Sequence, residues 1–315
     1  MKILQSLVYF LILLVGTSAL CEIRTPPIQD TLPLFPVKVN GKWGYMDTSG
    51  VIVIRPQFRE ASWFSEELAA VTTWYEWVFI DKTGKISVVP DTTYGYAHPG
   101  YFSDGLCSFW NGEVVGYMDK KGSIVIKPQY THAMSFSEGI AAVGTLHKDW
   151  QWHFIDRNGN MVFKQEFEFA YPFSEGLAAV ELEGKIGYIN REGKLVIRPQ
   201  FDARFDGSCD PNFSEDLAAV RVGGKFGYIN RGGKMVIDPQ FDRAGRFSEG
   251  LARVEVGQKW GYIDKFGKLV IAPQFSSACD FGNGLARVEI GKAATISSKI
   301  GYIDKMGKYV WEPRN

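Results

Sequence analysis

One short segment recurs along the whole chain, and this repetition constrains the fold more than any other feature. The best-preserved copy, residues 247–275, reads FSEGLARVEVGQKWGYIDKFGKLVIAPQF. Self-similarity at a fixed period is the signature of repeat architectures, in which each copy buries its apolar surface against its neighbours. An aromatic residue marks each of eight copies, at spacings of 34 to 40 residues: Tyr45, Phe79, Tyr117, Phe154, Tyr188, Tyr228, Tyr262 and Tyr302. We therefore predict a repeat array over residues 34–315.

Each copy predicts three β-strands. In the copy above, residues 251–256 alternate between apolar and charged side chains, which is typical of a half-buried strand. A short glycine-containing link joins them to residues 260–264, which are rich in aromatic and β-branched residues. Residues 268–271 form a third strand, and Pro273 ends it because proline cannot donate to a ladder. The unit is thus a three-stranded antiparallel meander.

The link between the second and third strands has an Asp or Asn followed three residues later by Gly in all eight copies, for example Asp264 and Gly267. An Asx side chain accepts hydrogen bonds from the backbone of a turn, and glycine tolerates positive φ. A calcium loop would gather several carboxylates, whereas Asn190 and Asn230 replace Asp in two copies. We interpret the pattern as a structural turn.

Two arrangements of the units are compatible with this pattern. A propeller commonly closes by completing one blade with strands from both termini. Here residues 34–39 give the first unit its own first strand, and residues 309–311 give the last unit its own third strand. The sequence therefore favours an all-β tandem array that is open and superhelical or solenoid-like, with an eight-bladed β-propeller as the alternative.

Residues 1–19 have the features of a secretory signal peptide. Lys2 supplies a positive charge, residues 3–15 are apolar, and small residues precede a cleavage site near Ala19. The apolar run is shorter than the roughly 20 residues of a spanning helix. We therefore expect cleavage, no membrane span in the mature chain, and a secreted, periplasmic or cell-envelope protein. An uncleaved N-terminal anchor is the alternative.

Residues 20–33 are expected to link the signal to the array. Lipidation at Cys21 would require a small residue before it, and Leu20 argues against that. Cys209 and Cys279 lie between strands and could pair in an oxidising compartment. The chain has 35 basic and 35 acidic residues, which argues against nucleic-acid or anionic-membrane partners because both need a basic excess.

The motif Lys259-Trp260-Gly261-Tyr262, together with the later Val-Ile-x-Pro-Gln-Phe, resembles the WG-repeat family, also described as KWG repeats. The same motif opens the array as Trp43-Gly44. The resemblance implies a largely bacterial β-repeat scaffold of variable copy number. It implies no general activity and transfers no catalytic residue.

Catalysis normally needs one asymmetric constellation of side chains, so residues that break the repeat are the candidates. The four histidines (His98, His132, His147 and His153) have no usual ligand spacing, and no nucleophile or phosphate-binding motif is present. We therefore predict no enzyme activity, no cofactor and no metal.

The strongest departure from the repeat is aromatic. Residues 72–110 and 148–153 are rich in Trp and Tyr, and exposed aromatic faces bind glycans or peptides. Aromatic side chains that fill the seams between units are the competing interpretation, above all for Trp77 and Trp152 at the motif position. The candidate ligand contacts are Trp74, Tyr75, Tyr94, Tyr96, Trp110 and Trp150.

The sequence thus predicts an exported, non-catalytic scaffold that binds a protein or an envelope component. The first alternative is a carbohydrate-binding module that uses the aromatic cluster of the second repeat. A weaker alternative is a hydrolase whose site is assembled between repeats.

Overall fold

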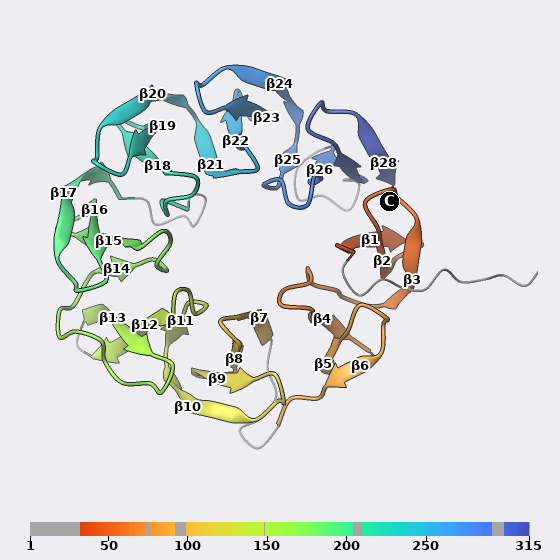
Figure 1. Cartoon of the computed structure of the whole chain (residues 1–315), viewed down its shortest axis with the longest axis horizontal. Coiled ribbons are helices and arrows are strands. Elements are labelled where there is room, and N and C mark those ends of the chain that lie inside the picture. Colours follow the sequence, from red (N-terminus) through yellow and green to blue (C-terminus); the bar gives the residue numbers. More distant parts are fainter. Residues whose placement is uncertain are drawn as a thin grey trace, which may run out of the picture.

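The computed structural model describes residues 32–73, 76–91, 99–147, 149–203, 210–291 and 299–314. Within these ranges the protein is all-β and forms eight small antiparallel sheets of three or four strands. The sheets follow one another around a closed ring (Figure 1). None of the described segments is a helix that could cross a membrane. The predicted signal peptide lies outside the described residues.

Each repeat contributes one sheet, and we number the repeats units 1 to 8 in chain order. The strands of units 1 to 4 are β1 (Phe35–Val39), β2 (Lys42–Met46) and β3 (Ile52–Phe58); β4 (Ala69–Thr72), β5 (Trp77–Ile80) and β6 (Ile86–Val88); β7 (Pro99–Ser103), β8 (Leu106–Trp110), β9 (Val115–Asp119) and β10 (Ile124–Tyr130); and β11 (His132–Ala133), β12 (Ile140–His147) and β13 (Asp149–Asp156).

Units 5 to 8 repeat the meander with small differences. Their strands are β14 (Phe169–Ala170), β15 (Leu177–Leu182), β16 (Lys185–Asn190) and β17 (Leu195–Asp202); β18 (Leu217–Val222), β19 (Lys225–Asn230) and β20 (Met235–Phe241); β21 (Arg243–Ser248), β22 (Leu251–Val256), β23 (Lys259–Asp264) and β24 (Leu269–Phe275); and β25 (Ser277–Ala278), β26 (Ala286–Ile290), β27 (Lys299–Ile303) and β28 (Tyr309–Arg314). Where a meander has its third strand, that strand lies at the perimeter, as β24 does in Figure 1. Where a fourth strand occurs, it comes from the segment that enters the unit.

The glycine of the Trp-Gly motif lies beneath a bulge in the third strand. In unit 5, Ile186 pairs with Phe201 but Tyr188 pairs with Ile197, so extra residues arch over Gly187. A Cβ atom on Gly187 would lie 2.8 Å from the Ile197 carbonyl oxygen and 2.8 Å from the Pro199 nitrogen. No side chain fits there, and glycine is required because of this close approach.

Two units replace this glycine, and both have a reduced third strand. Val78 stands there in unit 2, where β6 has only 3 residues. His153 stands there in unit 4, where isolated bridges from Ile155 to Met161 and from Trp152 to Phe167 replace the ladder. We infer that a side chain at this position prevents the third strand from closing over the second.

The marker aromatics join each unit to the next. Each lies on the second strand and packs on a phenylalanine of the following unit; the Tyr228 and Phe247 ring centroids, for example, are 4.9 Å apart. The tyrosines also donate their hydroxyl to a backbone carbonyl of the next unit, as Tyr228 does to Gly245 at 2.8 Å. The other hydroxyl bonds of this kind are Tyr45 to Ser62, Tyr117 to Met134, Tyr188 to Pro211, Tyr262 to Cys279, and Tyr302 to Pro36.

The last of these bonds closes the ring, because it joins unit 8 to unit 1. Phe35, Val37 and Met46 of unit 1 share one core cluster with Tyr302 and Trp311 of unit 8. The all-β tandem array is confirmed, and its arrangement is the predicted alternative, an eight-bladed propeller, rather than the open superhelix that we favoured. The expectation failed because it assumed that closure needs a shared strand, whereas side chains close this ring.

Candidate functional site

The repeated Asx residues form turns. Asp264 Oδ1 accepts hydrogen bonds from the backbone N–H groups of Phe266 (3.0 Å) and Lys268 (2.9 Å). Asn230 Oδ1 accepts the equivalent bonds from Gly232 (3.1 Å) and Lys234 (3.0 Å). Because the Asn amide accepts the same hydrogen bonds as the Asp carboxylate, the interpretation as a structural turn is confirmed.

The repeated Ser-Glu-Gly segment also has a structural role, which we call the latch. The second and third residues of this segment have positive φ, a conformation that favours Asn and Gly. In unit 6, for example, φ of Glu215 is 55°. The Glu215 carboxylate accepts a hydrogen bond from the Gly250 N–H of unit 7 at 3.0 Å and pairs with Lys265 at 3.0 Å. Burial raises the pKa of Glu215, but these bonds outweigh it and the pKa is lowered overall. The strained glutamate is thus held by the unit that follows.

The six predicted contact residues are distributed as follows. Trp110 ends β8 and its side chain is 48% exposed. Trp150 lies on β13, where its backbone pairs with Leu146. Trp74, Tyr75, Tyr94 and Tyr96 lie outside the described residues, and their role stays a prediction.

A recess with aromatic walls lies where units 1, 2 and 3 meet, and we call it the aromatic recess. It has a volume of about 420 Å³ and is formed by units 1, 2 and 3. Trp43 and Trp77 are the motif tryptophans of units 1 and 2, and Tyr101 comes from the segment that enters unit 3. The remaining lining residues are Glu60, Ala61, Ser62, Ala70, Pro99 and Gly100. Such a volume lies within the range of small-ligand sites.

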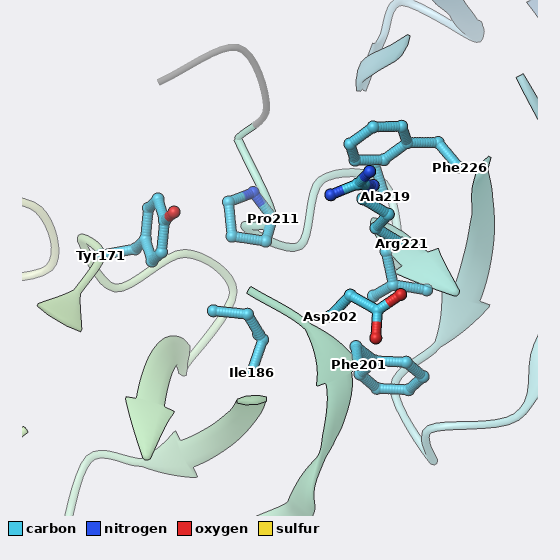
Figure 2. A pocket seen from close by; sticks show the side chains of 9 residues that line it. Tyr171, Ile186, Phe201, Asp202, Pro211, Ala219, Arg221 and Phe226 are labelled. Carbon is cyan, nitrogen blue, oxygen red and sulfur yellow. The ribbon is translucent and has the colours of Figure 1, made fainter. Parts of the chain in front are cut away.

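The equivalent seam between two other units is filled by side chains. Between units 5 and 6, Ile186 and Phe226 occupy the positions of Trp43 and Trp77, and the cavity shrinks to about 20 Å³. Figure 2 shows the Arg221 side chain beside the Phe226 ring. A cavity of this size holds about one water molecule. The aromatic recess is therefore a departure from the repeat rather than a consequence of it.

The aromatic recess has polar groups at its edges. Burial and the Cys279 thiol raise the pKa of Tyr101, with Arg287 acting in the opposite direction, so its hydroxyl is a hydrogen-bond donor at neutral pH. The Arg287 guanidinium and the Lys38 ammonium each lie 5.9 Å from the centre of the Trp43 ring. Glu60 is the one carboxylate among the described lining residues. The site combines flat apolar faces with a few hydrogen-bonding groups.

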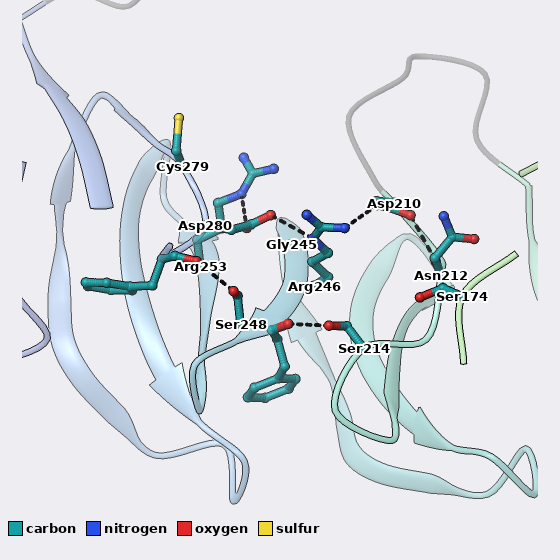
Figure 3. A network of polar contacts seen from close by, with 12 residues as sticks. Ser174, Asp210, Asn212, Ser214, Gly245, Arg246, Ser248, Arg253, Cys279 and Asp280 are labelled. Carbon is teal, nitrogen blue, oxygen red and sulfur yellow. Dashed lines mark hydrogen bonds and ion pairs between the residues drawn. The ribbon is translucent and has the colours of Figure 1, made fainter. Parts of the chain in front are cut away.

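A second polar cluster joins units 6, 7 and 8. Asp280 pairs with Arg253 at 2.8 Å and with Arg246 at 3.5 Å, and Arg246 lies 4.0 Å from Asp210 (Figure 3). Arg253 also lies over the Trp260 ring, 5.0 Å from its centre. The charges are paired between neighbouring units, so we assign the cluster a structural role.

The described cysteines and histidines show no reactive cluster. Burial raises the pKa of Cys107 to about 12 and also raises the pKa of Cys279, and both are free thiols. Cys209, the predicted partner of Cys279, lies outside the described residues. His153 Nε2 lies 3.3 Å from the Thr145 hydroxyl. In the ranges that the structure describes, no three His, Cys, Asp or Glu side chains gather as metal ligands would.

Comparisons with known proteins agree with the repeat. A family model described as "WG containing repeat" matches residues 43–73, 116–144, 152–185, 186–226, 226–260 and 260–292. The chain belongs to the WG-repeat family. A comparison with curated proteins found no match.

Solved structures similar to this WG-repeat protein share its fold. A crystal structure described as the eukaryotic initiation factor is 13% identical, with a TM-score of 0.52, and the match covers 90% of this chain and 85% of that one. AztD of Citrobacter koseri is also 13% identical, with a TM-score of 0.50 and coverage of 90% and 93%. At this identity the likeness concerns the fold alone.

Proposed function

We propose that this WG-repeat protein is an exported, non-catalytic scaffold that binds carbohydrate in the aromatic recess. The observation that carries the proposal is the contrast between two equivalent seams, about 420 Å³ at units 1 to 3 and about 20 Å³ at units 5 and 6. The walls of the larger one are Trp43, Trp77 and Tyr101. Sugar rings stack on flat aromatic faces, and their hydroxyl groups need a few placed polar partners.

The acidic side chain that lines the aromatic recess favours sugar binding over glycoside hydrolysis. Glycoside hydrolysis generally uses two carboxyl groups on either side of the scissile bond. Glu60 is the one acidic side chain among the described lining residues. Its role is therefore that of a hydrogen-bond acceptor for sugar hydroxyls. Among the described lining residues, the hydrolase alternative finds no second carboxyl group.

Titration calorimetry of the whole protein with neutral and uronic-acid oligosaccharides tests the proposal. Tyr101→Ala removes a side chain that is 47% exposed and should abolish binding without unfolding the protein. Trp110→Ala is the matched control, since Trp110 is 48% exposed and does not line the aromatic recess. Equal binding by both variants, or none by the wild type at millimolar sugar, would refute the proposal.

Export rests on the signal-like residues 1–19. N-terminal sequencing of the protein recovered from envelope and culture fractions tests it. A mature chain that begins at Leu20 would support export. An intact Met1 in a cytoplasmic fraction would contradict it.

A further inference from the structure

The charge beside the aromatic recess departs from the repeat. On the first strand of the meander, one residue pairs directly with the residue at the tryptophan position of the motif. Unit 1 has Lys38 there, opposite Trp43. Units 5, 7 and 8 have a glutamate at the same place: Glu181, Glu255 and Glu289. Beside the recess, the charge at this position is therefore reversed.

Unit 6 also has a cation at this position, but without space for a ligand. Arg221 pairs there with Phe226, and both line the cavity of about 20 Å³ between units 5 and 6. The Arg221 side chain thus helps to fill its seam. Lys38, in contrast, lies beside Trp43, which lines the recess of about 420 Å³. Positive charge and a ligand-sized volume coincide at the aromatic recess.

The Lys38 ammonium is placed by the Trp43 ring rather than by a carboxylate. It lies 5.9 Å from the ring centre, near the outer limit of a cation–π contact. None of the ion pairs between described residues involves Lys38. In unit 7 the charge at the equivalent position is compensated, because Glu255 pairs with Arg243 at 3.3 Å. The positive charge of Lys38 therefore remains available to an anion.

Two further hydrogen-bond donors lie close to the recess. The Arg287 guanidinium is also 5.9 Å from the centre of the Trp43 ring. One of its nitrogens pairs with Glu289 at 2.6 Å, whereas its Nε is buried and has no hydrogen-bond partner among the described residues. Burial raises the pKa of Tyr101, so its hydroxyl keeps its proton at neutral pH. The surroundings of Trp43 are therefore rich in donors.

Glu60 is the lining carboxylate, and it would repel an anion. Its side chain is exposed, so water and salt screen that repulsion. Glu60 can still accept a hydrogen bond from a sugar hydroxyl. An anionic sugar therefore finds an uncompensated cation at the recess and only a screened negative charge.

We propose that the aromatic recess selects acidic sugars, namely oligosaccharides that contain uronic acid. This inference rests on the proposed carbohydrate site and names the ligand class of that site. The uronic-acid ring stacks on Trp43, its carboxylate pairs with Lys38, and its hydroxyl groups bond to Tyr101 and Glu60. A neutral sugar stacks in the same way but forms no charge-assisted hydrogen bond, which is the stronger kind.

Methyl esterification removes the charge of a uronic acid and keeps its ring, so an acid and its ester form a matched pair of ligands. Titration calorimetry of the full chain compares oligomers of galacturonate, glucuronate and mannuronate, each with its methyl ester. At least one acid should bind about tenfold more tightly than its ester. Added salt should reduce this preference, because it screens the ion pair.

Two lysine variants locate the source of the preference. Lys38→Gln should abolish the preference and leave the affinity for the ester unchanged, whereas Lys38→Arg should keep it. Lys42→Gln is the matched control: it removes the same charge from an exposed residue next to Trp43 in β2, and adjacent strand residues point to opposite faces. Circular dichroism and the melting temperature check that each variant is folded.

Equal affinity for acid and ester, or equal effects of Lys38→Gln and Lys42→Gln, would overturn this inference. If neutral oligosaccharides still bind in that case and Tyr101→Ala abolishes their binding, the carbohydrate site stands without the preference for acids. If no acid, ester or neutral oligosaccharide binds at millimolar concentration, the carbohydrate site is itself refuted, and the preference with it.

Discussion

The hydroxyl of Tyr302 donates a hydrogen bond to the carbonyl oxygen of Pro36 at 2.6 Å, and 266 residues of chain separate the two. In seven seams the marker aromatic packs on the phenylalanine of the segment that enters the next unit, but unit 1 has Asp30 at that position. At the closing seam Tyr302 packs instead on Phe35 of β1, 5.6 Å between ring centres. Trp63 of unit 2 joins this pair, 6.1 Å from Tyr302 and 6.2 Å from Phe35. A side chain from a third unit thus completes the contact between the two ends.

Trp63→Ala should destabilise the closing seam, although the Trp63 side chain is only partly buried. We expect a loss of about 2 kcal/mol in the free energy of unfolding, below the roughly 3–5 kcal/mol of a fully buried aromatic. Urea unfolding monitored by circular dichroism measures it. Phe266→Ala, at a side chain that is 92% exposed, is the control and should change stability by less than about 0.5 kcal/mol. Equal effects of the two variants would refute the role of Trp63.

Tyr302→Phe should cost about 1 kcal/mol, since it removes one hydroxyl and leaves the Pro36 carbonyl buried without its donor. Tyr228→Phe removes the equivalent bond to Gly245 within the ring and should cost a similar amount. Urea midpoints of the two variants measure both effects. An unchanged midpoint for Tyr302→Phe would show that the hydrogen bond does not help to close the ring.

Gly187→Ala should destabilise the protein by about 1–3 kcal/mol, because the added methyl group displaces the bulge around Pro199. Gly232→Ala is the matched control, since its Cβ would meet only Asn230 Oδ1 at 3.4 Å. Thermal unfolding measures both. Hydrogen exchange should in addition show faster exchange along β17 in Gly187→Ala. If the two alanine variants are equally stable, the close approach is not what requires glycine.

Acid should destabilise the fold through its Asx turns. Burial raises the pKa of Asp47 and of Asp81, but hydrogen bonds within the turns outweigh it, and both pKa values are lowered. The pKa of Asp156 is lowered chiefly by the Asn160 side chain. The folded state therefore binds fewer protons than the unfolded one near pH 4. This contribution is complete above about pH 4, the unfolded value, and is lost as the pH falls through the lowered values.

Replacing Asp47, Asp81 and Asp156 with Asn tests this pH dependence. Asn190 and Asn230 show that the amide forms the same turn. The triple variant should fold at pH 7, and its melting temperature should fall less than that of the wild type between pH 4 and pH 2. Parallel curves for the two proteins would contradict the prediction.

The repeat made the units predictable, because strand alternation, the Asx turn and the terminal proline are local patterns present in every copy. The closed ring was not predictable in the same way, since it depends on Tyr302, Pro36 and Trp63, which are far apart in the chain. The aromatic recess was only partly anticipated. Residues 72–110, which the sequence singled out, contain Trp77 and Tyr101. Trp43, in contrast, belongs to a copy that follows the repeat pattern. Sequence reasoning also missed that Leu32 and Pro33 stand where the other units have an acidic residue and usually a glycine, and the latch is absent from both seams that flank unit 1 in the described structure.

Because side chains close the ring, the number of units does not depend on how the strands of each sheet are connected. In a propeller that shares a blade between its termini, a duplicated repeat must still return the last strand to the first blade. Here each described sheet is completed by its own segment, and units 8 and 1 meet through groups such as Tyr302 and Pro36. A gene that gains or loses one repeat keeps every sheet intact, and what must change is the angle at which neighbouring units pack.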